Sequence, residues 1–384
     1  MGLSRRPQVQ TGSLKFDPVI ITISLAFVVI GLLFTYSASA FETSSFVKRQ
    51  LVFDGIGLVV AWILSQHFTK LLKWKIFSPP VLLGITWVLL IVVLFTRAQA
   101  HTHRWIDVFG VFKLQPSEIA KVTLVIYVAS CLEETAGKLT KNLSLIKKPL
   151  IAALITIGLI VAEKDIGIPA LMGGVFLAML FVGGMQKKIV GILIGLGSMA
   201  GLVFMLVVPY RRARLFSFLH LTEDTSSGVS YQVMQSFLAV GSGGAFGKGL
   251  GNSELKLQYL PAAHTDFIFS VMCEEIGLLV LLVVWGFALF LWRGIVLSKK
   301  AKTTFNSMVI FGLTLTLCAQ AFFNMAMAIG LLPTKGIALP FFSYGGSSVV
   351  MTLAMVGIIL HLAAIDHTQT NVRRDTAFTR RIHR

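Results

Sequence analysis

Stretches of about 20 consecutive apolar residues recur along the whole chain and limit how it can fold. An α-helix of about 20 residues is roughly 30 Å long, which matches the hydrocarbon thickness of a bilayer. Of the 384 residues, 55% are hydrophobic and only 13% are charged, whereas soluble domains contain about 25% charged residues. The sequence therefore predicts an all-α polytopic membrane protein.

Ten segments are long and apolar enough to count as membrane spans. They cover approximately residues 18–39, 49–66, 76–96, 116–133, 147–163, 166–185, 188–208, 266–292, 305–331 and 343–365. We expect one ten-helix membrane domain, 18–365, after a short N-terminal segment, 1–17. A basic tail, 366–384, follows, and we expect it to lie on the inner leaflet or to be disordered.

The distribution of lysine and arginine predicts which side each loop faces. If the N-terminus is cytoplasmic, the inner segments hold 21 basic residues, the outer segments 12, and the fourth span one. An excess on the cytoplasmic side is the usual bias of membrane proteins. Both termini are therefore predicted to be cytoplasmic, and the long connection between the seventh and eighth spans, 209–265, is extracytoplasmic. The net charge of +17 suits loops beside anionic lipid rather than nucleic acid.

Three cysteines, Cys131, Cys273 and Cys318, lie in or at the ends of apolar segments. Their number is odd, none lies in the long connection, and no Cys-x-x-Cys motif occurs. We therefore expect neither a disulfide framework nor a zinc site.

Asp266 is a carboxylate at the start of an apolar span, directly after the long outer connection. A charge at a membrane boundary is costly and usually faces a cavity or a partner. The residue could simply cap its helix, which on position alone is the commoner explanation. Its polar neighbours, His264 and Thr265, favour a second interpretation, in which Asp266 is a catalytic base.

Cations gather in the predicted outer segments although the usual bias opposes them there. They include Arg104, Arg211, Arg212, Arg214, Lys248, Lys256 and Lys335. Guanidinium and ammonium groups around an outer cavity suit a pyrophosphate ligand. Each residue could instead pair with lipid headgroups or with acidic residues of the long connection. The prediction of an anionic ligand therefore rests on the seven cations together and not on any single one.

Two further pairs of charged residues lie inside predicted spans. Glu118 and Lys121 could neutralise each other or line a central cavity. Glu274 and Glu275 cannot face the same way, because adjacent helical residues differ by about 100°. We expect one of the two glutamates to neutralise a basic residue on another span.

The glycine-rich segment 241–251 does not fit a phosphate-binding loop. Ser242 stands where the first glycine of that motif belongs, and Gly249 follows Lys248 in place of serine or threonine. The glycines are better explained by tight turns and close backbone approach to a ligand or lipid.

Taken together and in order, the motifs resemble the SEDS family (shape, elongation, division and sporulation) over most of the chain. Two stretches, 256–261 and 332–336, are more similar to its division members than to its elongation members. The motifs that carry the resemblance are Arg104–Asp107, Gln115–Lys121, Tyr210–Arg214, Tyr231–Ser236, Gly247–Gly251, His264–Phe267, Glu274–Gly277 and Ser343–Ser347.

The resemblance implies a peptidoglycan glycosyltransferase that polymerises lipid II, an undecaprenyl-pyrophosphate-linked disaccharide-pentapeptide. It would act at the outer face of the bacterial inner membrane, at the division septum, with Asp266 as the essential carboxylate. The implied partners are a class B penicillin-binding transpeptidase resembling FtsI and other divisome membrane proteins. The sequence requires no cofactor and predicts no metal site, although it leaves room for a divalent cation. The substrate-binding candidates are Arg104, Glu118, Lys121, Arg211, Arg212, Arg214, Lys248, His264, Lys335 and Ser343.

Some positions depart from the family's pattern. Ala100 and His101 stand where Asn-Gly is frequent, and Glu163-Lys164-Asp165 stands where Gln-Pro-Asp is frequent. Details of the cavity lining are therefore open.

Three alternatives stay open. A transporter that moves lipid II would also need ten spans and buried charges, although its binding groups should lie near the bilayer midplane. An elongation-type polymerase would share the chemistry, and an inactive scaffold would only recruit the transpeptidase.

Overall fold

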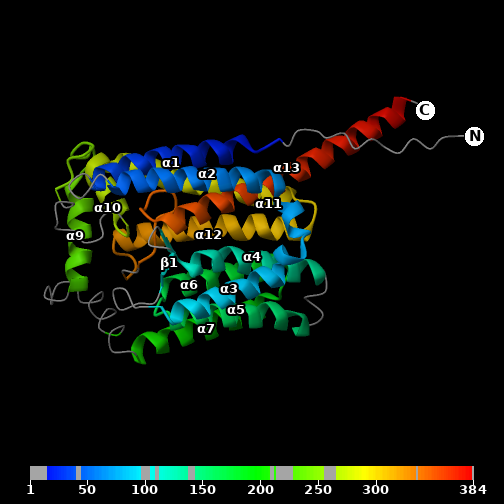
Figure 1. The fold of residues 1–384 in the computed structure, drawn as a ribbon, viewed down its shortest axis with the longest axis horizontal. Helices are drawn as coiled ribbons and strands as arrows, with labels where there is room; N and C mark the ends of the chain where they lie inside the picture. Colours follow the sequence, from blue (N-terminus) through cyan, green and yellow to red (C-terminus); the bar gives the residue numbers. More distant parts are fainter. Residues whose placement is uncertain are drawn as a thin grey trace, which may run out of the picture.

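The computed structural model describes residues 15–39, 45–96, 104–108, 112–136, 143–207, 212, 228–254, 265–333 and 336–382. These residues form a bundle of long helices (Figure 1). The elements are α1 (Pro18–Ser39), α2 (Ser45–Leu72), η1 (Lys75–Phe77), α3 (Pro79–Leu94), β1 (Ile106–Val108), β2 (Phe112–Leu114), α4 (Pro116–Glu134), η2 (Leu143–Ile146), α5 (Lys147–Ala162), α6 (Gly167–Val182), α7 (Lys187–Val207), α9 (Gly228–Ser242), α10 (Ile268–Ile276), η3 (Gly277–Val280), α11 (Leu281–Lys300), α12 (Thr304–Ala328) and α13 (Gly346–Ile382).

Every one of the ten predicted spans corresponds to helix in the structure, so the prediction of a polytopic helical protein is confirmed. Seven stretches have the length and hydropathy of a membrane crossing, and α3 and α6 are shorter apolar helices. The remaining predicted span is α4, which has 19 residues and includes four charged side chains. The last helix begins at Gly346 and continues to Ile382, well beyond the predicted span.

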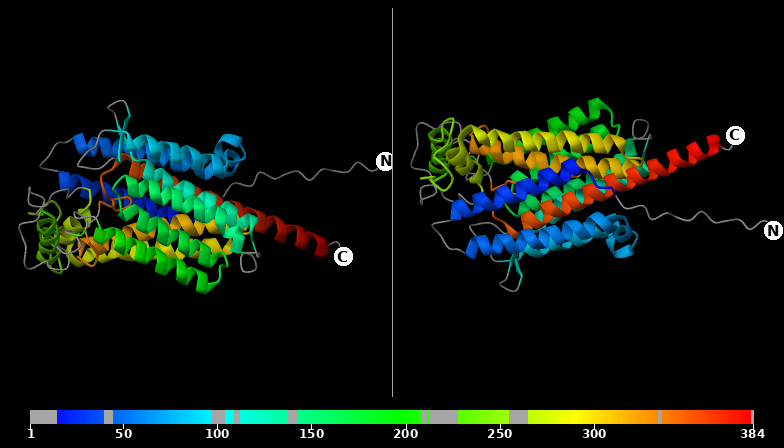
Figure 2. Two further views of the ribbon diagram at one scale, coloured as in Figure 1. Left: turned by 90° about the horizontal axis from the view of Figure 1, so that it is seen from below. Right: turned by 90° about the horizontal axis from the view of Figure 1, so that it is seen from above.

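The two ends of the bundle differ in character. The start of α1 and the end of α13 lie at one end, whereas β1, α9 and the start of α10 lie at the other (Figures 1 and 2). We call the second the site end; it contains the β1–β2 hairpin, Asp266 and the connection from α12 to α13. This arrangement agrees with an even number of crossings. Which end faces the cytoplasm remains a prediction from charge.

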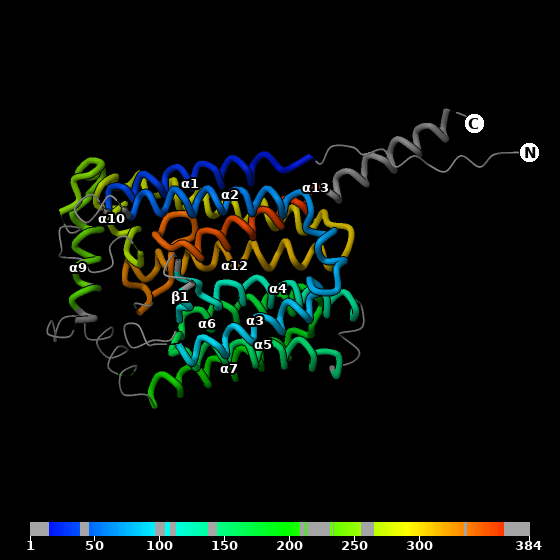
Figure 3. The backbone as a smooth tube through the Cα atoms, in the orientation of Figure 1, coloured from blue at the N-terminus to red at the C-terminus, as the bar shows by residue number. Residues whose placement is uncertain are grey.

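Helix α12 lies at the centre of the bundle and contacts α4, α6, α11 and α13 (Figure 3). Among the described helices, α2 and α13 have the most extensive contact, and glycine allows their backbones to touch. A Cβ atom on Gly357 would lie 2.4 Å from the carbonyl oxygen of Ala61. At the periphery, α7 packs on α6, and most of its apolar side chains face outward. That exposure is expected of a helix surrounded by lipid.

The predicted eighth span is broken in the structure. It begins as α10, passes through η3 and continues as α11, and Gly277 has a φ of +56° at the break. The break is held by the glycine-rich turn after α9, because the N–H of Lys248 donates to Glu274 O and that of Gly249 to Glu275 O. A Cβ on Gly247 would lie 2.2 Å from Glu275 O. The backbone approach is close, as predicted, but it is made to α10 and not to a ligand or lipid.

Candidate functional site

Asp266 lies in the turn that leads into α10 at the site end, and it is half-buried. Two segments from the C-terminal part of the chain fix its backbone. The side-chain amide of Asn324 on α12 donates to the Asp266 carbonyl over 2.8 Å, and the Ser343 hydroxyl donates to the carbonyl of Thr265. The N-cap of α10 is Phe267, which has no side-chain cap. Asp266 is therefore not the N-cap residue of α10, which the capping explanation would require.

Gly336 brings the Asp266 carboxylate and the Arg104 guanidinium together. A Cβ atom placed on Gly336 would lie 3.3 Å from Asp266 Oδ2 and 3.4 Å from Arg104 Nη1. The two predicted site residues, 162 positions apart in the sequence, thus contact the same glycine. A side chain at this position would crowd both charged groups, so glycine keeps the space between them open.

The remaining nitrogens of Arg104 face the turn between α5 and α6. Its Nη2 donates to the carbonyl of Lys164 over 3.3 Å, and its Nε lies 3.5 Å from Asp165 Oδ2. The other oxygen of Asp165 accepts from the N–H groups of Gly167 and Ile168, which begin α6. Asp165 therefore caps α6 and fixes Arg104 at the same time.

Glu163 directly follows the last residue of α5, two residues before Asp165, and is completely buried. Neither of its carboxylate oxygens has a hydrogen-bond partner among the described residues. Burial, reinforced by the nearby Asp165 carboxylate and opposed by Arg104, raises the pKa of Glu163 to about 8. In the sequence, this segment stands out only as a departure from the family's pattern.

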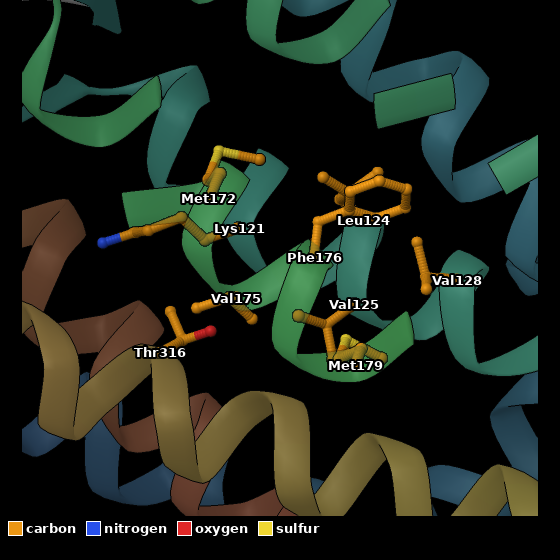
Figure 4. A pocket seen from close by; sticks show the side chains of 9 residues that line it. All are labelled: Lys121, Leu124, Val125, Val128, Met172, Val175, Phe176, Met179 and Thr316. Atoms are coloured by element: carbon orange, nitrogen blue, oxygen red, sulfur yellow. The ribbon is translucent and has the colours of Figure 1, made fainter. Parts of the chain in front are cut away.

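Glu118 and Lys121 form a buried ion pair, with Lys121 Nζ 2.9 Å from Glu118 Oε1. The same ammonium donates to Gln320 on α12, whose amide donates to the carbonyl of Ala338. The stem of Lys121 borders a cavity with α6, while its nitrogen points away from the apolar lining (Figure 4). Because the space holds only about 10 Å³, it has room for no more than one water molecule. The pair supports the connection that carries Gly336.

Lys248 lies beside two glutamates and not beside Asp266. Its Nζ is 2.9 Å from Glu274 Oε1 and 3.3 Å from Glu254 Oε2. The hydrogen bond that Lys248 donates to the Glu274 carboxylate raises the pKa of Lys248. The predicted partner for one of the two buried glutamates is thus found, on the glycine-rich turn and not on another span. A role for Lys248 toward pyrophosphate stays a prediction.

Of the other predicted substrate-binding residues, the structure describes Ser343 and Arg212. Ser343 is buried and holds backbone groups, since it also accepts from the N–H of Leu339. Arg212 is exposed. The predicted roles of Arg211, Arg214, His264 and Lys335 fall on residues outside the described ones. Within the part of the chain that the structure describes, no group of three or more potential metal ligands occurs, and the three cysteines are free and buried.

Several residues that build the site were not found from the sequence. Asn324 binds both the Asp266 carbonyl and that of Ile337, each over 2.8 Å. Gln320 lies one turn earlier on the same face of α12. The available signal was a pair of amides four residues apart in an otherwise apolar span, because polar groups inside a membrane usually face a partner. Their partners are loop backbone groups that only the fold reveals.

The fold and the site together define a polytopic membrane protein with a carboxylate–guanidinium site at one end of its bundle. Residues 17–368 match the family model described as cell cycle protein, which covers FtsW, RodA and SpoVE. The chain belongs to this family.

The relatives support the same assignment. A protein of Geobacter metallireducens named probable peptidoglycan glycosyltransferase FtsW is 35% identical, over 91% of this chain and 95% of the relative. Stage V sporulation protein E of Bacillus subtilis is 36% identical, over 90% of this chain and 96% of its own.

Two solved structures share the fold. A chain from a peptidoglycan synthase complex that coordinates polymerization and crosslinking superposes with a TM-score of 0.75 at 27% identity, covering 91% of this chain and 98% of that one. The rod shape determining protein RodA of Thermus thermophilus gives a TM-score of 0.66 at 25% identity, covering 91% and 97%.

Proposed function

We propose that this protein is a peptidoglycan glycosyltransferase that polymerises lipid II at the outer face of the cytoplasmic membrane. The observation that carries the proposal is the convergence of Asp266 and Arg104 on Gly336. A base for the attacking hydroxyl and a cation for the departing diphosphate are the two groups that this transfer needs most. The names of the relatives support the reaction class.

In the proposed reaction, the acceptor lipid II presents its GlcNAc 4-hydroxyl to Asp266. The hydroxyl oxygen attacks the anomeric carbon of the lipid-linked glycan strand, and its proton passes to the Asp266 carboxylate during the attack. A glycosidic bond forms with inversion as the bond to the diphosphate oxygen breaks. Undecaprenyl pyrophosphate leaves, and Arg104 stabilises its negative charge.

The backbone contacts explain how the base is held. Asn324 and Ser343 bind the carbonyls of Asp266 and Thr265, so the carboxylate is carried by a segment with few alternative positions. Such positioning contributes strongly to catalysis, because a displacement of about 1 Å can cost about 100-fold in rate.

The cellular role that we propose is septal wall synthesis with a class B penicillin-binding transpeptidase. The support is twofold: relatives that are 35% and 36% identical are named FtsW, and one of the matching structures comes from a peptidoglycan synthase complex. Depletion of the protein in its host tests this role. Filaments with unfinished septa support division, whereas rounded cells that still divide would assign the protein to elongation.

The biochemical test is polymerisation of purified lipid II in detergent, where no second compartment exists. Wild-type protein should form glycan strands, with and without the transpeptidase, and Asp266→Asn should not. Asp107→Asn makes the same chemical change at an exposed residue of β1 and should retain activity. If Asp266→Asn formed glycan strands at the wild-type rate, the assignment of Asp266 as the base would be refuted. Absence of strands from the wild type in both conditions would favour a transporter or a scaffold.

A further inference from the structure

The turn between α5 and α6 holds charged groups that the proposed reaction does not yet use. Glu163 is fully buried, both its oxygens lack hydrogen-bond partners within the described residues, and Asp165 Oδ2 and Arg104 Nε are likewise buried without a hydrogen bond. A buried carboxylate without a partner costs several kcal/mol when ionised. A protein that keeps one beside its site needs a compensating charge or a proton.

Every nitrogen of the Arg104 side chain faces a different neighbour. Nε faces Asp165, Nη2 binds the Lys164 carbonyl, and Nη1 lies against Gly336 beside Asp266. The guanidinium thus spans the distance between the α5–α6 turn and the proposed base. A stronger attraction between the α5–α6 turn and the guanidinium therefore leaves Arg104 fewer hydrogen bonds and less positive charge for a substrate.

We propose that Glu163 is a positioning residue whose protonation state sets how firmly the α5–α6 turn retains Arg104. With Glu163 neutral, only one ionised carboxylate of the turn, Asp165, faces the guanidinium, at a separation of 3.5 Å that is long for a charged hydrogen bond. With Glu163 ionised, two carboxylates of the turn attract the same guanidinium and hold it away from the departing diphosphate. The inference rests on the proposed glycosyl transfer.

Among the residues that the structure describes, few charged groups surround Glu163. Asp165 on the same turn opposes its ionisation, and Arg104 favours it. Lys164 between them is exposed. Among the described residues of the helices packed against α5, α3 and α6 contain no charged side chain, and the charges of α4 at the site end are the mutually paired Glu118 and Lys121. The pKa of Glu163, raised to about 8, places its titration in the range where an enzyme can be assayed.

The test is the pH dependence of kcat/KM for lipid II polymerisation by wild type and Glu163→Gln. The wild type should lose activity on the alkaline side of a midpoint near pH 8. Glu163→Gln, which is isosteric and cannot ionise, should move this alkaline limb upward by about one pH unit or more. The matched control is Glu134→Gln, the same change at an exposed position at the other end of α4, and its profile should equal that of the wild type.

Arg104→Lys supplies the second arm, because lysine cannot present a planar fork to several partners at once. If Glu163 acts by positioning Arg104, the shift caused by Glu163→Gln should disappear in the Arg104→Lys background. The same alkaline limb in wild type and Glu163→Gln would overturn the inference, and so would an equal shift in both backgrounds. Either result leaves the glycosyltransferase proposal intact as long as wild type polymerises lipid II and Asp266→Asn does not.

Discussion

Asn324 offers the sharpest test of how the fold positions the base. It is fully buried on α12, and its one amide nitrogen donates to the carbonyls of Asp266 and Ile337, each over 2.8 Å. This nitrogen ties the turn before α10 to the connection that carries Gly336. Replacing Asn324 by alanine removes both hydrogen bonds and leaves the rest of α12 able to form.

The expected effects on stability and activity differ in size. Each hydrogen bond contributes about 1 kcal/mol net, and leaving a buried carbonyl unsatisfied costs about 1–3 kcal/mol. The Ile337 carbonyl belongs to a buried residue, whereas half-buried Asp266 can recover a bond from water, so we expect a total loss of about 2–3 kcal/mol. A displacement of Asp266 by about 1 Å should lower kcat about 100-fold.

The assay combines thermal unfolding in detergent with the lipid II polymerisation rate at a temperature where every variant is folded. Asn324→Asp should be worse than Asn324→Ala, because it places a carboxylate against two carbonyl oxygens. Asn306→Ala, at the opposite end of α12, is the control and should change neither quantity greatly. A folded Asn324→Ala protein with wild-type activity, beside an inactive Asp266→Asn protein, would refute the positioning argument.

Three further predictions follow from packing and charge. Gly357→Ala should destabilise the α2–α13 pair strongly, because its Cβ would lie 2.4 Å from a backbone oxygen, whereas Gly84→Ala, with open space around it, should be neutral or stabilising when melting temperatures are compared. Lys121→Met should cost about 3–5 kcal/mol in denaturant unfolding, since it leaves a buried glutamate without its cation. At Asp17, burial raises the pKa, but the arginine partner on α11 and the backbone N–H groups at the start of α1 together lower it below the usual 3.8. Asp17 should therefore stabilise the protein above pH 3.8 and lose that contribution as the pH falls through its lower folded value, so Asp17→Asn should flatten the acid limb of thermal stability.

The helices could be predicted because each depends on its own composition. A run of apolar residues must satisfy its backbone groups within itself when it crosses a bilayer, so length and hydropathy decide the element. The ends were less predictable. Helix α2 runs from Ser45 to Leu72, beyond its predicted limits, because amphipathic turns at both ends continue the helix outside the apolar stretch.

The break at Gly277 and the hairpin of β1 and β2 escaped prediction for a different reason. The break depends on hydrogen bonds from the turn after α9, such as that from Lys248 N–H to Glu274 O. The hairpin consists of two strands of three residues, which is too short for an alternating pattern to be recognised. In both cases the structure is decided by partners outside the segment.

The candidate site shows the same division. Asp266 and Arg104 were identified as chemically suitable groups, but no spacing in the sequence relates them, since Gly336 joins them only in the folded chain. Glu163 was visible as a residue that differs from the family's pattern. Its burial and its missing partners could not be inferred before the α5–α6 turn was seen next to Arg104.

The contacts of the candidate site explain why polar residues occur in the otherwise apolar helix α12. Irregular backbone at membrane depth is tolerated only where other protein groups satisfy its hydrogen bonds. The connection after α12 and the turn before α10 are both irregular, and Gln320, Asn324 and Ser343 bind their carbonyl groups. These side chains therefore stabilise loops, and Gln320 also links α12 to Lys121 of α4. Substituting them with apolar residues of similar size should leave the bundle folded while the loops lose their fixed positions, so the polarity of α12 is a requirement of the site.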